Sequence, residues 1–245
     1  MSKLNPTKHI PNALTLINLF LGCLSIVSAF EGDLLMAGYL ILLAAVFDYL
    51  DGFMARLLKA YSPLGKELDS LSDLVSFGLA PSVIIFHLLK STLRISESQG
   101  FLTGNVILVI PFLIAAFSAL RLAKFNIDTR QTTSFIGLPT PANAIFIVGL
   151  VLGLNSPFGA WFEVVTSSST AIIVMVLVLS ALLVSPIPMF SLKIKSFNLR
   201  ETWQQQLLVV LALLTIFALG RASVAPVILL YILISVISGI FKKSH

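Results

Sequence analysis

Charged residues are scarce in this sequence, and cysteine is almost absent. Asp, Glu, Lys and Arg make up 11% of the 245 residues, whereas an average soluble protein carries about 25%. Hydrophobic residues make up 57%, so the composition excludes an ordinary soluble domain and indicates an integral membrane protein. The single cysteine, Cys23, excludes an intrachain disulfide bond. We expect it to be a small buried residue of the first apolar segment.

The sequence also predicts no cleaved signal peptide, soluble domain, long linker or internal repeat. Its first apolar segment follows polar residues 1–12 and leads directly into further apolar segments, without a small-residue cleavage pattern. A membrane-spanning helix requires about 20 mostly apolar residues. Eight segments qualify, roughly 14–30, 34–58, 68–90, 102–125, 139–155, 168–190, 203–220 and 223–241. We therefore predict an all-α fold, a polytopic helical bundle that forms a single membrane domain over residues 1–245.

The basic residues indicate how these helices are oriented. If the amino terminus is cytoplasmic, all but three of the 16 Lys and Arg residues fall on the inner side, the exceptions being Lys90, Arg94 and Arg221. The positive-inside rule therefore predicts that both termini are cytoplasmic. Membrane topology thus accounts for the net charge of +5, and we expect no nucleic-acid partner.

Acidic residues number only 11, yet four of them lie at the predicted cytoplasmic ends of the second and third segments. On the third helix, Asp69 and Asp73 lie one turn apart, after Gly65. The short turn at Ser62-Pro63 predicts that the second and third helices are antiparallel neighbours, so their acidic faces should meet. The matching face of the second helix, within an arc of about 140°, carries Asp48, Asp51, Gly52, Ala55 and Arg56.

Four carboxylates this close together need compensating positive charge, because like charges oppose each other's ionisation. One arginine, Arg56, cannot balance four carboxylates, whereas divalent cations can. Mg²⁺ and Mn²⁺ prefer oxygen ligands and often bridge carboxylates to phosphates. We therefore predict two such ions, with room beside Gly52 for a phosphorylated ligand. The predicted metal ligands are Asp48, Asp51, Asp69 and Asp73.

Three other interpretations compete with a metal site. Intramembrane aspartates can be structural, pairing with arginine or capping helices. A divalent-cation transporter would also use carboxylates, but it would spread them along a path through the membrane. The remaining acidic residues instead lie near predicted helix ends or in loops. A non-catalytic scaffold would tolerate the loss of Asp73. Clustering at a single depth favours a binding site.

The acidic segment also matches a known pattern. Its spacing, Asp48-x-x-Asp51-Gly52-x-x-Ala55-Arg56 followed by Gly65, Asp69 and Asp73, resembles the signature of the CDP-alcohol phosphatidyltransferase family at all eight fixed positions over 26 residues. Three further stretches are similar to the phosphatidylserine synthase branch of that family: residues 10–26 (IPNALTLINLFLGCLSI), 121–126 (RLAKFN) and 135–144 (FIGLPTPANA). That branch has a small residue in place of Asn143. The resemblance predicts a catalytic core in residues 1–155 and additional transmembrane helices in residues 156–245.

The resemblance implies a reaction that depends on Mg²⁺ or Mn²⁺, in which the phosphatidyl group of CDP-diacylglycerol is transferred to L-serine. In this interpretation Asp73 is both a metal ligand and the general base that deprotonates the serine hydroxyl. The nucleotide and its phosphates are expected to contact Gly52, Ala55, Arg56, Gly65, Asn12 and Thr15. Recognition of the acceptor or the lipid phosphate is expected from Arg121, Lys124, Asn126, Arg130, Pro139 and Thr140.

The resemblance also implies a homodimer in membrane lipid, and the positive-inside orientation predicts that the active site faces the cytoplasm. The acceptor stays open at this point, because glycerol phosphate or inositol phosphate would need the same chemistry. The basic cluster of Arg121, Lys124 and Arg130 also fits simple positive-inside anchoring.

Overall fold

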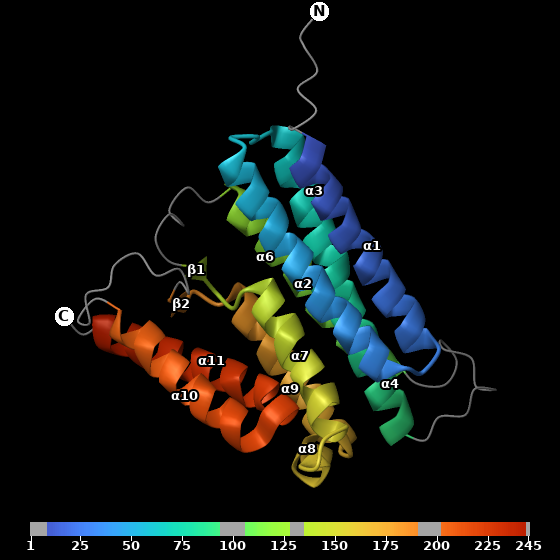
Figure 1. Cartoon of the computed structure of the whole chain (residues 1–245). Coiled ribbons are helices and arrows are strands. Elements are labelled where there is room, and N and C mark those ends of the chain that lie inside the picture. The colour runs from blue at the N-terminus through green and yellow to red at the C-terminus, as the bar shows by residue number, and fades with distance from the viewer. Residues whose placement is uncertain (1–8, 94–105, 128–134, 191–201, 244–245) are drawn as a thin grey trace, which may run out of the picture.

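The part of the chain that the structure describes folds almost entirely into helices. The computed structural model describes residues 9–93, 106–127, 135–190 and 202–243. Figure 1 shows the amino-terminal helices packed lengthwise against one another, and α10 and α11 as a pair at the carboxyl-terminal side. The predicted all-α helical bundle is confirmed for the described residues.

The helices follow most of the predicted apolar segments. The amino-terminal half contains α1 (Ile10–Phe30), α2 (Leu34–Leu57), α3 (Pro63–Asp73), the π-helical turn η2 (Leu74–Leu79), α4 (Ala80–Thr92), the 3-10 helix η3 (Val106–Phe112) and α6 (Leu113–Ile127). The carboxyl-terminal half contains α7 (Thr140–Leu154), α8 (Gly159–Thr166), α9 (Ser169–Val184), α10 (Trp203–Leu219), the 3-10 turn η4 (Gly220–Ser223) and α11 (Val224–Lys243). Two short strands, β1 (Phe135–Ile136) and β2 (Pro188–Met189), form an antiparallel pair.

Several helical stretches are long and apolar enough to cross a membrane. Within the described ranges, five qualify on their own: Ile10–Phe30, Leu34–Leu57, Pro63–Thr92, Val106–Ile127 and Trp203–Gly239. Helices α8 and α9, bent by 83° at their junction, pass the same test only when taken together, so they form either a broken sixth span or a re-entrant loop. These spans indicate a multi-pass membrane protein. The count of eight spans and the cytoplasmic position of the termini stay predictions.

Local sequence explains where α2 and α3 begin. The Asp33 side chain caps α2 by accepting a hydrogen bond of 2.9 Å from the Met36 N–H. The Ser62 hydroxyl oxygen caps α3 by accepting a bond of 2.9 Å from the Gly65 N–H. Pro63 follows at the first helical position, where its fixed φ suits a helix start. The third span therefore begins at Pro63 rather than near residue 68.

The stretch formed by α3, η2 and α4 lies at the centre of the bundle. Of its most apolar part 72% is buried, against 17–33% for the other four spans. This stretch packs closely on α1 at Gly22, which has no side chain. A Cβ atom at that position would lie only 2.9 Å from Ser76 Cα, too close for any larger residue. The hydroxyl groups of Ser72 and Ser76 donate to the carbonyl oxygens of Thr15 and Asn18, at 3.1 and 3.0 Å. These contacts hold the aspartate-bearing helix α3 against α1.

The central helix widens immediately after Asp73. In η2 the Ala80 N–H donates to the Val75 carbonyl oxygen, five residues back instead of four. Such π-helical turns are rare and occur frequently at functional sites. Here the turn lies directly beside one of the predicted catalytic residues.

The β1–β2 pair fixes the start of α7. Gly137 adopts a φ of +80°, a conformation that glycine accepts more readily than other residues. Its N–H donates to the Ile187 carbonyl oxygen at 2.9 Å, and the Leu138 N–H donates to the Leu182 carbonyl oxygen at 2.9 Å. The chain therefore enters α7 at Thr140 along a fixed path.

Two predictions about the fold are wrong. The predicted helix over residues 168–190 ends at Val184, because Pro186 and Pro188 lack the N–H groups that a continuing helix would use. The chain there is extended and contributes β2. Cys23 is exposed on the outer surface of α1 rather than buried, because the buried stripe of this helix runs through Asn18 and Gly22 instead.

Candidate active site

Three carboxylates converge where the end of α2 meets α3. Asp48 and Asp51 lie on the last turns of α2, and Asp69 lies on α3. One carboxylate oxygen of each lies within 4.8 Å of those of the other two. The two acidic helix faces therefore meet, as their residue spacing predicts.

Asp73 lies beside this trio without belonging to it. Its side chain is 8% exposed, and its carboxyl group adjoins that of Asp48 closely enough for a hydrogen bond when one of the two is protonated. Its Oδ1 atom has no hydrogen-bond partner. The guanidinium group of Arg121 is close enough to interact with Asp73 electrostatically. A buried carboxylate oxygen without a protein partner is available to a cation, a ligand or a proton.

The donor set of the cluster fits a hard divalent cation. The three converging ligand atoms are all carboxylate oxygens, and the described residues add no histidine or cysteine to the group. Mg²⁺ and Mn²⁺ prefer such oxygen ligands. Asp73, whose carboxyl group adjoins that of Asp48 and whose Oδ1 has no hydrogen-bond partner, offers a further oxygen ligand.

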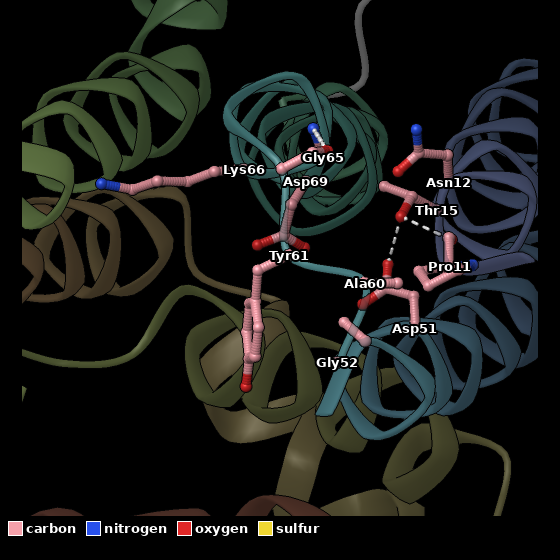
Figure 2. A pocket seen from close by; sticks show the side chains of 12 residues that line it. Pro11, Asn12, Thr15, Asp51, Gly52, Ala60, Tyr61, Gly65, Lys66 and Asp69 are labelled. Carbon is pink, nitrogen blue, oxygen red and sulfur yellow. Dashed lines mark hydrogen bonds between the residues drawn. The ribbon is translucent and has the colours of Figure 1, made fainter. Parts of the chain in front are cut away.

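Helix α1 supports the cluster through Thr15. The Thr15 hydroxyl donates to Asp51 Oδ2 at 2.6 Å, and the Pro11 carbonyl oxygen lies 3.0 Å away as an alternative acceptor. Thr15 and Asp51 are 3% and 6% exposed. The dashed lines in Figure 2 mark these bonds. Three helices therefore meet at the carboxylates, two that carry them and one that holds Asp51 in place.

A cavity of about 200 Å³ opens beside the carboxylates. Its wall comes from the start of α1, the end of α2, the loop of residues 58–62 and the start of α3 (Figure 2). Asp51 and Asp69 form its acidic part. Of the six residues predicted to contact the nucleotide, those that line the cavity are Asn12, Thr15, Gly52, Ala55 and Gly65.

Arg56, the sixth, has an exposed side chain and does not line the cavity. It bends back over its own helix, and its Nη1 atom lies 3.5 Å from the position that a Cβ atom on Gly52 would occupy. The guanidinium group is therefore held next to a cavity residue.

Two of the predicted acceptor residues meet inside the protein. Arg121 of α6 is 7% exposed, and its Nη1 donates to the hydroxyl oxygen of the fully buried Thr140 at 3.3 Å. Pro139 is the residue that caps α7 and leads into Thr140. The Nε of Arg121 has no hydrogen-bond partner. A buried guanidinium with an unused donor that also faces Asp73 can bind an anionic group.

The other predicted acceptor residues lie elsewhere. Lys124 is exposed. Asn126 ties the end of α6 to α3, because its Nδ2 donates to Ser70 Oγ at 2.8 Å and its carbonyl oxygen accepts from Lys66 Nζ at 2.9 Å. Arg130 falls outside the described residues.

Sequence reasoning missed one polar residue near the site, Tyr231, and marked a second buried polar residue, Asn143, only as a departure from the family pattern. Tyr231 on α11 is buried, donates to the Phe190 carbonyl oxygen at 3.2 Å, and lies near enough to Arg121 to interact with it electrostatically. Asn143 on α7 is fully buried, and neither side-chain polar atom has a partner. The only signal for Tyr231 in the sequence was a lone tyrosine in an apolar segment, whereas Asn143 stood out as a departure from a known pattern.

The comparison with known proteins agrees with this geometry. Residues 8–187 match the family model described as CDP-alcohol phosphatidyltransferase. The chain is 38% identical over 151 residues to a CDP-diacylglycerol–serine O-phosphatidyltransferase of Helicobacter pylori strain J99, a match that covers 61% of the chain and 60% of that protein. The chain thus spans less than two thirds of that relative.

Of two other relatives, one matches a longer part of the chain and the other carries a different enzyme name. A protein of Mycobacterium leprae, also named CDP-diacylglycerol–serine O-phosphatidyltransferase, is 34% identical over 233 residues, covering 92% of the chain and 70% of the relative. An archaetidylserine synthase of Methanothermobacter thermautotrophicus is 38% identical over 162 residues, covering 65% of each.

Proposed function

Because the chain belongs to the CDP-alcohol phosphatidyltransferase family, we propose that it transfers the phosphatidyl group of CDP-diacylglycerol to the hydroxyl group of L-serine, giving phosphatidylserine and CMP. The observation that carries the proposal is the convergence of Asp48, Asp51 and Asp69 within 4.8 Å at a cavity. The names of the relatives from Helicobacter pylori and Mycobacterium leprae support serine as the acceptor.

The carboxylate cluster would hold two divalent cations, Mg²⁺ or Mn²⁺. When bound, these ions would neutralise the pyrophosphate of the donor and the charge that develops on departing CMP. Thr15 would keep Asp51 in one orientation through its 2.6 Å hydrogen bond. The residues that supply ligands would be Asp48, Asp51, Asp69 and Asp73.

The cavity would receive the nucleotide end of the donor. Its small residues Gly52, Ala55 and Gly65 leave space beside the acidic wall, and Asn12 offers an amide for a polar contact. The fork of donors on Arg56 would bind a phosphate at the edge of the cavity. The acyl chains would remain in the surrounding lipid.

Asp73 would be the general base. The serine hydroxyl oxygen attacks the phosphorus bonded to diacylglycerol, the bond from that phosphorus to the CMP oxygen breaks, and Asp73 accepts the hydroxyl proton. The unpartnered Oδ1 of Asp73 supports this role, because no protein donor occupies the atom that would take the proton. The adjoining carboxyl group of Asp48 keeps the base next to the metal ligands.

The acceptor would be recognised on the α6–α7 side of Asp73. Arg121 would bind the serine carboxylate or the lipid phosphate, with Thr140 holding the guanidinium and Pro139 setting the start of α7. Lys124 and Asn126 would extend this polar side toward the aqueous phase, from which serine arrives, and Arg130 is proposed for the same role from the sequence alone.

The site would face the cytoplasm, and the protein would form a homodimer. The orientation is supported by the positive-inside rule, because Arg56, Lys59, Lys66 and Lys124 all lie at the end of the bundle that carries the carboxylates. The homodimer is proposed from the family resemblance.

An acceptor competition tests the proposed reaction. Membranes containing the protein are incubated with CDP-diacylglycerol and with labelled L-serine, glycerol 3-phosphate or inositol phosphate. We expect label to enter lipid only from serine, with one CMP released for each serine incorporated. Incorporation from glycerol 3-phosphate or inositol phosphate alone would refute serine as the acceptor. The transfer of the phosphatidyl group from CDP-diacylglycerol would still stand, with a different acceptor. Absence of CMP release with all three would refute the transferase assignment.

A further inference from the structure

The loop between α2 and α3 contributes a part of the cavity wall that carries no acidic residue. Ala60, Tyr61 and Ser62 all line the cavity. Ala60 is 8% exposed, whereas Tyr61 is 74% exposed. Figure 2 shows Tyr61 among the side chains around the cavity. Tyr61 therefore lines the cavity while most of the residue's surface is exposed.

The backbone holds Tyr61 in this position from both sides. On the α2 side Lys59 adopts a φ of +51°, which is uncommon for residues other than glycine and marks a constrained turn. The Ala60 N–H donates to the Ala55 carbonyl oxygen at 3.0 Å. On the α3 side the Ser62 hydroxyl accepts a bond from the Gly65 N–H at 2.9 Å. Tyr61 thus lies between two anchored residues.

The faces of the Tyr61 ring are open. Within the described residues no other aromatic ring packs on it, whereas Tyr49 of α2, which is also exposed, stacks on Phe53 with ring centroids 6.4 Å apart and planes at 15°. Both tyrosines lie near the same end of the bundle, where tyrosine is common at the membrane interface. Only Tyr61 of the two lines the cavity.

Different residues of the cavity wall suit different parts of a nucleotide. Phosphate groups belong beside Asp51 and Asp69, where a divalent cation fits. The nucleoside base is the one flat aromatic part of the donor, and small residues such as Gly52, Ala60 and Gly65 leave space for a planar group. Stacking on an aromatic side chain is a general way for proteins to bind a base.

We propose that the ring of Tyr61 stacks on the cytosine base of the nucleotide donor. The proposal rests on the proposed function, because it requires a cytidine nucleotide in the cavity. Tyr61 would thereby add to donor affinity without touching the reacting phosphorus, and its hydroxyl group would not be needed.

A binding measurement with two probes tests this role. The purified protein with Mg²⁺ is titrated by calorimetry with CDP, which carries a base, and with methylenediphosphonate, which carries two phosphoryl groups and no base. Tyr61→Leu should weaken CDP binding by about fivefold to 100-fold and leave methylenediphosphonate binding unchanged. Tyr61→Phe should bind both probes like the wild type. Tyr49→Leu is the matched control for loss of an exposed tyrosine, and it should also bind both probes normally.

The outcomes separate this proposal from the reaction itself. Unchanged CDP affinity in Tyr61→Leu would overturn the stacking role while leaving the transferase assignment intact. Equal weakening of both probes would also overturn it, because damage to the whole cavity would then explain the loss. If the wild type binds neither probe and releases no CMP with serine, the proposed function fails and the stacking role fails with it.

Discussion

The hydroxyl group of Thr15 donates a hydrogen bond of 2.6 Å to Asp51 Oδ2. This bond joins α1 to the carboxylate cluster of α2 and α3, and both side chains are buried. A hydroxyl group donates a single proton, so the Pro11 carbonyl oxygen at 3.0 Å competes for it. The Thr15 hydroxyl therefore orients Asp51, a proposed metal ligand, whenever it donates to that carboxylate.

Thr15→Val should weaken Mn²⁺ binding by about 10-fold to 100-fold, the effect usually found when a partner of a metal ligand is lost. Valine keeps the shape of threonine and removes only the donor. Thr15→Ser keeps the hydroxyl group and should bind Mn²⁺ like the wild type. Electron paramagnetic resonance of free Mn²⁺ measures both affinities. Equal affinity of Thr15→Val and the wild type would show that the hydrogen bond has no influence on the site.

Asp73→Asn should reduce the rate of CMP release by at least about 100-fold, because the substitution removes the proposed general base. The melting temperature should stay close to that of the wild type, since asparagine has nearly the same shape and still fits the buried position. Glu67→Gln, an exposed acidic position on the same helix, is the control and should retain activity. An active Asp73→Asn variant would exclude Asp73 as the base.

The acidic cluster could be predicted from the sequence because it depends on local geometry. The helical period places Asp48 and Asp51 on one face, and a short turn brings α3 alongside α2. Ser62 and Pro63 indicate the start of α3, because serine is favoured as the residue that caps a helix and proline at the first helical position. These are short-range effects, so a single sequence contains them.

On the other side of the site, Arg121 and Thr140 were named only through the family resemblance, and their contact could not be predicted from residue spacing because it depends on long-range packing. Arg121 of α6 contacts Thr140 at the start of α7, shortly after the β1–β2 pair, although the two residues are 19 positions apart in the sequence. Tyr231 approaches from α11, more than 100 residues further along the chain from Arg121, and no periodic pattern marks it. The wide turn η2 has the sequence LVSFGL, in which no residue requires a π-helical geometry.

Arg121→Lys should raise the KM for serine by about 10-fold, since an ammonium group keeps the charge but loses the guanidinium fork. The KM for CDP-diacylglycerol should stay unchanged if Arg121 binds the serine carboxylate. Thr140→Val removes the hydroxyl that accepts from Arg121 and should shift the KM for serine in the same direction. Steady-state kinetics with each substrate varied in turn separates the two constants. A rise in the KM for CDP-diacylglycerol alone would assign Arg121 to the lipid phosphate.

Divalent-cation binding by the purified protein tests the central claim most directly. Mn²⁺ is titrated into the wild type and into Asp48→Asn and Asp69→Asn, one substitution on each of the two helices that form the cluster. We predict saturable Mn²⁺ binding to the wild type, strong loss in both variants, and loss of CMP release after chelation that added Mg²⁺ or Mn²⁺ restores. A wild type that binds no Mn²⁺, or variants that bind it as tightly as the wild type, would contradict a metal site formed by these carboxylates.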